Sequence, residues 1–180
     1  METTTEYTIE DVKRDAGKEV AKREHSERMQ LIIFKLGSEE YGLSIEQIKE
    51  VVLTPRIAKM PQTPEHIKGV ANIRGNIIAI MDLEQKFGLM KSGSLENNNN
   101  SNYTLVVESE EYKVGVLVKE VPNTLSINVS DIDTASNFVQ YTSLDTNSVI
   151  GVVKSGERMI ILIDMIKLIE AENLKETLTK

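Results

Sequence analysis

The sequence of 180 residues contains no cysteine and only two histidines, His25 and His66. The absence of cysteine excludes disulfides, thiol nucleophiles, iron–sulfur clusters and cysteine-ligated zinc. Two histidines with no other obvious ligand beside them in the sequence cannot build a multi-histidine metal site. We therefore expect this chain to bind no metal ion and no cofactor.

The chain also lacks an excess of positive charge and a long hydrophobic run. It has 21 Lys and Arg against 28 Asp and Glu, which gives a net charge of −7. Nucleic-acid binding is disfavoured, because phosphate contacts require Lys and Arg. No apolar run approaches the roughly 18–20 residues of a membrane span, and the acidic N-terminus is unlike a secretory signal. These features predict an acidic, soluble, cytoplasmic protein.

Motifs that carry catalysis are missing as well. The sequence has no glycine-rich phosphate loop, no Gly-x-Ser-x-Gly elbow and no His–Glu metal helix. His66 lies in a connection punctuated by Pro55, Pro61 and Pro64, where no nucleophile is evident, and we interpret it as a surface or half-buried side chain. We therefore expect that the chain is not an enzyme.

The first 28 residues differ in composition from the rest of the chain. They carry eight acidic and six basic residues and few apolar ones. Ile9, Val12, Ala16 and Val20 have a helical spacing, but four apolar residues offer little surface to bury. We predict a flexible, charged tail over residues 1–28.

From Met29 onward, short runs rich in Val, Ile and aromatic residues alternate with turns that contain Gly, Asn or Ser. This pattern is typical of short β-strands, and the absence of long alternating helices disfavours a parallel α/β fold. Strands are predicted over 30–36, 41–45, 48–53, 67–73, 77–81, 103–107, 112–118, 121–127, 149–154 and 158–163. A short helix is predicted over 83–87, and a C-terminal helix from Met165. The predicted fold class is all-β with short helices.

The chain repeats itself across an Asn-rich stretch, 96–102, which is predicted to be a hinge. The repeated segments are Ser38-Glu39-Glu40-Tyr41 with Ser109-Glu110-Glu111-Tyr112, Lys49-Glu50-Val51 with Lys119-Glu120-Val121, Gly69-Val70 with Gly151-Val152, and Asp82 with Asp164. The duplication predicts two lobes, about 29–95 and about 103–178, each with about five strands that form a small barrel or curled sheet. Asp82 and Asp164 each follow a strand and precede a helical segment, so both are predicted to cap a helix.

The turn between the predicted fourth and fifth strands differs between the two copies. The first copy has Asn72-Ile73-Arg74-Gly75, and the second has Val153-Lys154-Ser155-Gly156. Arg74 at the tip of a tight hairpin would be exposed, and its guanidinium suits a carboxylate or a backbone carbonyl of a partner. An ordinary solvated turn arginine is the alternative, and the residues alone leave both interpretations open.

The segment from Gly69-Val70 through Asn72-Ile73-Arg74-Gly75 to Asp82-Leu83 resembles the signature of the CheW-like chemotaxis coupling family. That signature has Gly-Val, then Asn-Leu-Arg-Gly, an apolar strand and Asp-Leu. The resemblance extends over most of the chain outside the tail and implies a CheW-like domain over about 29–178. Where the family often has Pro and Arg, this sequence has Ala79 and Glu84.

The resemblance implies two five-stranded SH3-like barrels around a shared core and a non-enzymatic adaptor role. The implied partners are the regulatory domain of a chemotaxis histidine kinase and the cytoplasmic tips of methyl-accepting chemoreceptors. The protein would then be associated with the membrane only through these receptors. The implied partner-binding residues are Ile48, Glu50, Gly69, Asn72, Arg74 and Gly75.

Two other functions are weighed against the adaptor. A small-ligand sensor built from two barrels would need a pocket between the lobes. A β-barrel hydrolase would need a nucleophile and a base near one turn, and the sequence shows no such pair. The hydrolase is therefore the least favoured of the three functions.

Overall fold

The protein is described by a computed structural model over residues 27–89, 101–134 and 147–172. The predicted tail, apart from its last two residues, and most of the predicted hinge lie outside these ranges. The strands are β1 (Arg28–Leu36), β2 (Glu39–Ser44), β3 (Ile48–Leu53), β4 (Ile67–Ile73), β5 (Asn76–Met81), β6 (Tyr103–Glu108), β7 (Lys113–Val118), β8 (Asn123–Asn128), β9 (Ile132–Asp133), β10 (Val149–Ser155) and β11 (Arg158–Ile163). The helices are η1 (Ile45–Gln47), α2 (Leu83–Lys86), η2 (Val129–Asp131) and α3 (Met165–Ala171). None of the helices in the described ranges is long and apolar enough to cross a membrane.

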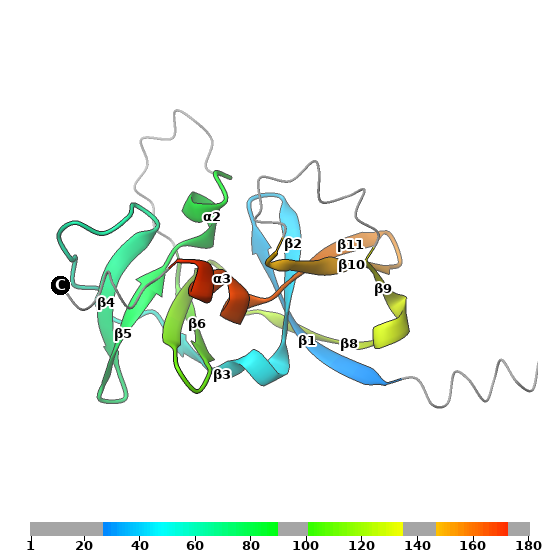
Figure 1. Cartoon of the computed structure of the whole chain (residues 1–180), viewed down its shortest axis with the longest axis horizontal. Coiled ribbons are helices and arrows are strands. Elements are labelled where there is room, and N and C mark those ends of the chain that lie inside the picture. Colours follow the sequence, from blue (N-terminus) through cyan, green and yellow to red (C-terminus); the bar gives the residue numbers. More distant parts are fainter. Residues whose placement is uncertain (1–26, 90–100, 135–146, 173–180) are drawn as a thin grey trace, which may run out of the picture.

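The strands form two sheets, with α3 between them in Figure 1. Sheet A has the order β8-β1-β2-β11-β10-β9, and sheet B has the order β3-β6-β7-β5-β4. The predicted all-β class with short helices is confirmed. Sheet A has a sixth strand because the two-residue β9 pairs with β10.

The two sheets do not follow the two halves of the sequence. Sheet A combines β1 and β2 with β8 to β11, and sheet B combines β6 and β7 with β3 to β5. The exchange is made by parallel pairing of β2 with β11 and of β5 with β7. The predicted lobes of about 29–95 and about 103–178 are therefore corrected, because the first hairpin of each half completes the sheet of the other half.

Some of the repeated motifs occupy equivalent positions in the two halves of the structure, and others do not. Gly69 and Gly151 each follow a β-bulge in corresponding strands, as the duplication predicts. The repeat of Ser38 to Tyr41 at Ser109 to Tyr112 is out of register, because two residues connect β1 to β2 and four connect β6 to β7. The repeat of Lys49-Glu50-Val51 is also displaced, since the first copy lies in β3 and the second precedes β8.

Three groups of buried side chains hold the sheets together. One group joins both sheets to α3 and includes Tyr41, Leu105 and Met165. Each sheet also has a core of its own on its other face. Because side chains alternate between the two faces of a strand, each sheet can contribute to its own core and to the shared one. The isoleucines predicted to be buried in both halves are buried, with exposed fractions of 3%, 0%, 3% and 1% for Ile78, Ile80, Ile161 and Ile163.

Each helix that follows a final hairpin starts at an aspartate. The carboxylate of Asp82 accepts a hydrogen bond from the Gln85 backbone N–H at 3.2 Å. The carboxylate of Asp164 accepts from the N–H groups of Ile166 and Lys167 at 3.1 and 3.2 Å. Both predicted N-caps are confirmed, and each satisfies backbone donors that a helix start leaves unpaired.

Candidate partner-binding site

The β4–β5 hairpin ends in a turn whose backbone fixes the position of Arg74. Arg74 has φ of 50° and Gly75 has φ of 83°, which is the pattern of a type I′ turn that matches the twist of a hairpin. The side-chain oxygen of Asn72 accepts a hydrogen bond from the Gly75 N–H at 2.9 Å. Asn72 and Gly75 therefore shape the turn, and Arg74 lies at its tip.

Arg74 forms an ion pair with Glu50 of β3. Its Nε donates to Glu50 Oε2 at 2.6 Å, and the exposed fractions of the two side chains are 76% and 20%. β3 and β4 are the two edge strands of sheet B, so the ion pair connects β3 to the hairpin at the opposite edge. Only Nε of the guanidinium is used in this contact, which leaves its two terminal nitrogens directed to no partner among the described residues.

Exposed apolar side chains lie on the same two elements. Val51 and Leu53 on β3 are 40% and 73% exposed, and Ile77 on β5 is 67% exposed. Ile48 at the start of β3 is half-buried against the shared core. Val51 and Leu53 alternate with Glu50 and Val52 along β3, so the exposed apolar side chains lie on the opposite side of the strand from the ion pair. Exposed apolar side chains at the edge of a sheet are typical of a protein-binding surface. We name the edge region of sheet B that contains Glu50, Val51, Leu53, Arg74 and Ile77 the β3–hairpin face.

Gly69 has a structural reason to be glycine. Its φ is +139°, and a Cβ atom there would lie 2.0 Å from the Ala58 carbonyl oxygen. At this point the β3–β4 connection lies antiparallel beside β4, where Ala58 and Val70 exchange backbone hydrogen bonds of 2.8 and 2.9 Å. A side chain would displace the connection from β4.

The structure thus brings four of the six predicted partner-binding residues together. Glu50, Asn72, Arg74 and Gly75 share one corner of sheet B. The residue-based interpretation missed Leu53 and Ile77. Both are large apolar residues at the end of a predicted strand. The strand pattern alone cannot show whether such a residue is exposed or buried.

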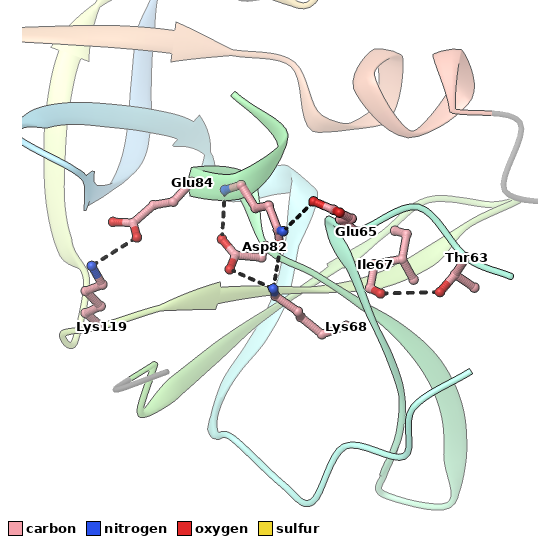
Figure 2. Close-up of polar contacts among 8 residues, drawn as sticks. Thr63, Glu65, Ile67, Lys68, Asp82, Glu84 and Lys119 are labelled. Atoms are coloured by element: carbon pink, nitrogen blue, oxygen red, sulfur yellow. Dashed lines mark hydrogen bonds and ion pairs between the residues drawn. The ribbon is translucent and has the colours of Figure 1, made fainter. Parts of the chain in front are cut away.

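Glu84, where the family often has Arg, lies at another contact between the sheets. Its Oε1 accepts from the Gly37 N–H at 2.9 Å, and its Oε2 pairs with Lys119 Nζ at 2.9 Å, as Figure 2 shows for Lys119. The same view shows Asp82 at the start of α2 with Lys68 beside it, at 3.7 Å between Nζ and Oδ2. The negative charge of Glu84 is therefore used within this chain.

A cavity of about 320 Å³ lies beside Glu84 and is lined from both sheets. Its charged side chains include the Glu84–Lys119 pair and the Glu40–Arg158 pair. Arg158 donates two hydrogen bonds of 2.9 Å to the Glu40 carboxylate. The cavity meets the geometric requirement of the small-ligand alternative. These four charged groups pair with each other, and Lys35 and Glu120 also line the cavity.

His66 is half-buried, as predicted, and has a partner. Its Nε2 lies 2.8 Å from Glu172 Oε2, and Glu172 also pairs with Lys86. Burial, with the positive charge of Lys86 as a second cause, holds the pKa of His66 below its ordinary value, so its ring is neutral near pH 7. Among the described residues, no group of three His, Asp or Glu side chains is placed to hold a metal ion.

Comparisons with known proteins agree with this architecture. The family model described as "CheW-like domain" matches residues 30–173. The chain is 34% identical over 145 residues to the "Chemotaxis protein CheW" of Klebsiella aerogenes, covering 81% of this chain and 84% of that protein. It is 30% identical to the protein of the same name from Helicobacter pylori, covering 78% of this chain and 81% of that protein.

A solved structure is similar over the same region. The crystal structure of the scaffolding protein TtCheW from Thermoanaerobacter tengcongensis matches with a TM-score of 0.65 and 34% identity, covering 78% of this chain and 87% of that chain. The expected resemblance is confirmed on three grounds: the family model covers most of the chain, two relatives are at least 30% identical, and the fold agrees. The chain belongs to the CheW-like family.

Proposed function

We propose that this protein is a non-enzymatic chemotaxis adaptor that couples chemoreceptors to a histidine kinase. Its proposed partners are the cytoplasmic tips of methyl-accepting chemoreceptors and the regulatory domain of the kinase. The relatives are named chemotaxis and scaffolding proteins, which supports an adaptor role. In this role the protein works in the cytoplasm and meets the membrane only through receptors.

The observation that carries the proposal is the Glu50–Arg74 pair on the β3–hairpin face. The type I′ turn and the ion pair hold the guanidinium in one place, although the side chain is 76% exposed. A preordered arginine loses less conformational entropy on binding than a free one. Exposed Val51, Leu53 and Ile77 supply apolar area that a partner can bury.

The small-ligand sensor remains the second candidate, and the cavity beside Glu84 is what favours it. Four of the charged residues that line the cavity pair with each other, whereas the β3–hairpin face presents two guanidinium nitrogens with no partner among the described residues and three exposed apolar side chains. The adaptor therefore explains more of the exposed surface than the sensor does.

The test measures binding of the purified chain to a receptor cytoplasmic fragment and to the kinase regulatory domain. Arg74→Ala should weaken at least one of the two interactions by about fivefold or more, as truncation of interface arginines does. Arg56→Ala is the matched control, because Arg56 is an exposed arginine on the β3–β4 connection. Circular dichroism checks that both variants fold. Absence of binding by the unmodified chain to either partner would refute the proposal.

A further inference from the structure

The chain passes between the two sheets at two corresponding places. From β2 in sheet A it enters β3 in sheet B through η1, and from β7 in sheet B it enters β8 in sheet A through residues 119–122. Each crossing contacts the helix that follows the last hairpin of the sheet it leaves. The first crossing contacts α3 through Gln47, and the second contacts α2 through Lys119.

Gln47 uses both ends of its side-chain amide at the start of α3. Its Nε2 donates to Asp164 Oδ1 at 3.0 Å, and its Oε1 accepts from the Met165 N–H at 3.1 Å. Met165 is fully buried, so its N–H has little access to water. A buried backbone donor without an acceptor lowers the free energy of unfolding. The hydrogen bond from the Met165 N–H to Gln47 therefore stabilises the fold.

The second crossing uses different chemistry. Lys119 Nζ pairs with Glu84 Oε2 (Figure 2) at 2.9 Å. The Lys119 side chain is 52% exposed. The Glu84 side chain is only 17% exposed, but the half-exposed Lys119 ammonium makes the ion pair sensitive to screening by salt. The side-chain amide of Gln47 carries no charge, and its part-buried hydrogen bonds to Asp164 and Met165 are therefore less sensitive to salt than a pair of opposite charges. The two crossings are therefore related by position and differ in how they depend on salt.

Gln47 directly precedes the strand that carries the candidate site. Ile48 begins β3, a bulge follows between Ile48 and Glu50, and Glu50 then binds Arg74. A β-bulge bends a strand and redirects the side chains that follow it, so the position of the residue before the bulge helps to set the direction of Glu50 toward Arg74. The side-chain amide of Gln47 supplies that attachment, 117 residues away along the sequence.

We propose that Gln47 is a positioning residue for the β3–hairpin face. By bonding the start of β3 to the N-terminus of α3, it holds the residue before the bulge in the place from which Glu50 reaches Arg74. This inference rests on the proposed function, because it concerns the same surface. Gln47 itself is not proposed to touch the partner.

The first measurement follows Arg74 without any partner. In a ¹H–¹⁵N spectrum, the Nε–H of Arg74 gives a signal that depends on its bond to Glu50, and loss of this signal in Arg74→Lys assigns it. We expect Gln47→Ala to shift or broaden the signal. Glu46→Ala is the matched control, since Glu46 is an exposed neighbour in the same 3₁₀ turn, and it should leave the signal unchanged.

The second measurement is affinity for the receptor fragment and for the kinase regulatory domain. Loss of the two amide hydrogen bonds should weaken binding through this face by about fivefold. Gln47→Lys retains a donor for Asp164 and should recover part of the affinity, whereas Gln47→Met fills the same space without hydrogen bonds and should not. Gln47→Met also serves as the test variant should Gln47→Ala fail to fold.

The outcomes separate this inference from the proposed function. An unchanged Arg74 signal in folded Gln47→Met would overturn the positioning role, whether or not partners bind. A changed signal with affinity within twofold of the unmodified chain would overturn the role in binding. Failure of the unmodified chain to bind either partner would instead refute the proposed function, and the spectrum would still decide whether Gln47 positions Glu50.

Discussion

Glu50 and Arg74 are 24 residues apart in the sequence and form an ion pair of 2.6 Å between the two edges of sheet B. Local structure does not account for this contact, because Glu50 lies on a strand and Arg74 lies at the tip of a hairpin. The pair depends on the curvature of sheet B, which brings its edges together. It therefore reports on the fold and on the candidate surface at once.

The first prediction separates stability from binding at this pair. Because the Arg74 side chain is 76% exposed, its coupling to Glu50 should stabilise the fold by only about 0.2–1 kcal/mol. A double-mutant cycle of Glu50→Ala and Arg74→Ala in urea unfolding measures this coupling. A coupling well above 1 kcal/mol would mean that Arg74 belongs to the structural framework, and its loss of binding would then follow from altered folding.

The second prediction concerns the two glycines of the candidate site. A methyl group at Gly69 would meet the Ala58 carbonyl oxygen, so Gly69→Ala should lower the free energy of unfolding by at least about 3 kcal/mol. A methyl group at Gly75 would have no atom within 4 Å apart from its chain neighbours, so Gly75→Ala should cost only about 1–2 kcal/mol for its positive φ. Urea unfolding of both variants tests the difference, and equal losses would contradict it.

The third prediction concerns the duplicated core. Ile80 and Ile163 are 0% and 1% exposed, and each belongs to a different buried group. Truncation of either to Ala should lower the free energy of unfolding by about 2–5 kcal/mol. Exposed Ile77 on the same strand as Ile80 is the control, and its truncation should change stability by no more than about 0.5 kcal/mol. A loss at Ile77 as large as at Ile80 would contradict the assigned faces of β5.

Much of the local structure could be predicted because its signals are local. β3, β4 and β11 begin and end where β-branched runs and flanking turns place them. The caps at Asp82 and Asp164 follow from an aspartate between a strand and a helical pattern. Each of these features depends on a few neighbouring residues, which the sequence displays directly.

The exchange of hairpins between the sheets could not be predicted in the same way. Parallel pairing of β2 with β11 joins residues more than a hundred positions apart, and no turn motif marks it. The internal repeat predicted two lobes, but a repeat is compatible with pairing inside a half and with pairing across halves. Likewise, the family resemblance implied that Glu50 and Arg74 each bind a partner, whereas their contact with each other and the contacts of Gln47 required the tertiary structure.

The last prediction concerns Glu40 of β2 and Arg158 of β11, which join an exchanged hairpin to its host sheet through two hydrogen bonds of 2.9 Å. The hydrogen bonds from Arg158 lower the pKa of Glu40 below its ordinary 4.5. The resulting stabilisation is present above pH 4.5 and is lost as the pH falls through the lowered pKa. Arg158→Met should raise the Glu40 pKa toward 4.5, as measured by carboxyl NMR titration. Lys35→Met, which removes a smaller charge effect, should raise it less. An unchanged Glu40 titration in Arg158→Met would show that this pair does not form in solution.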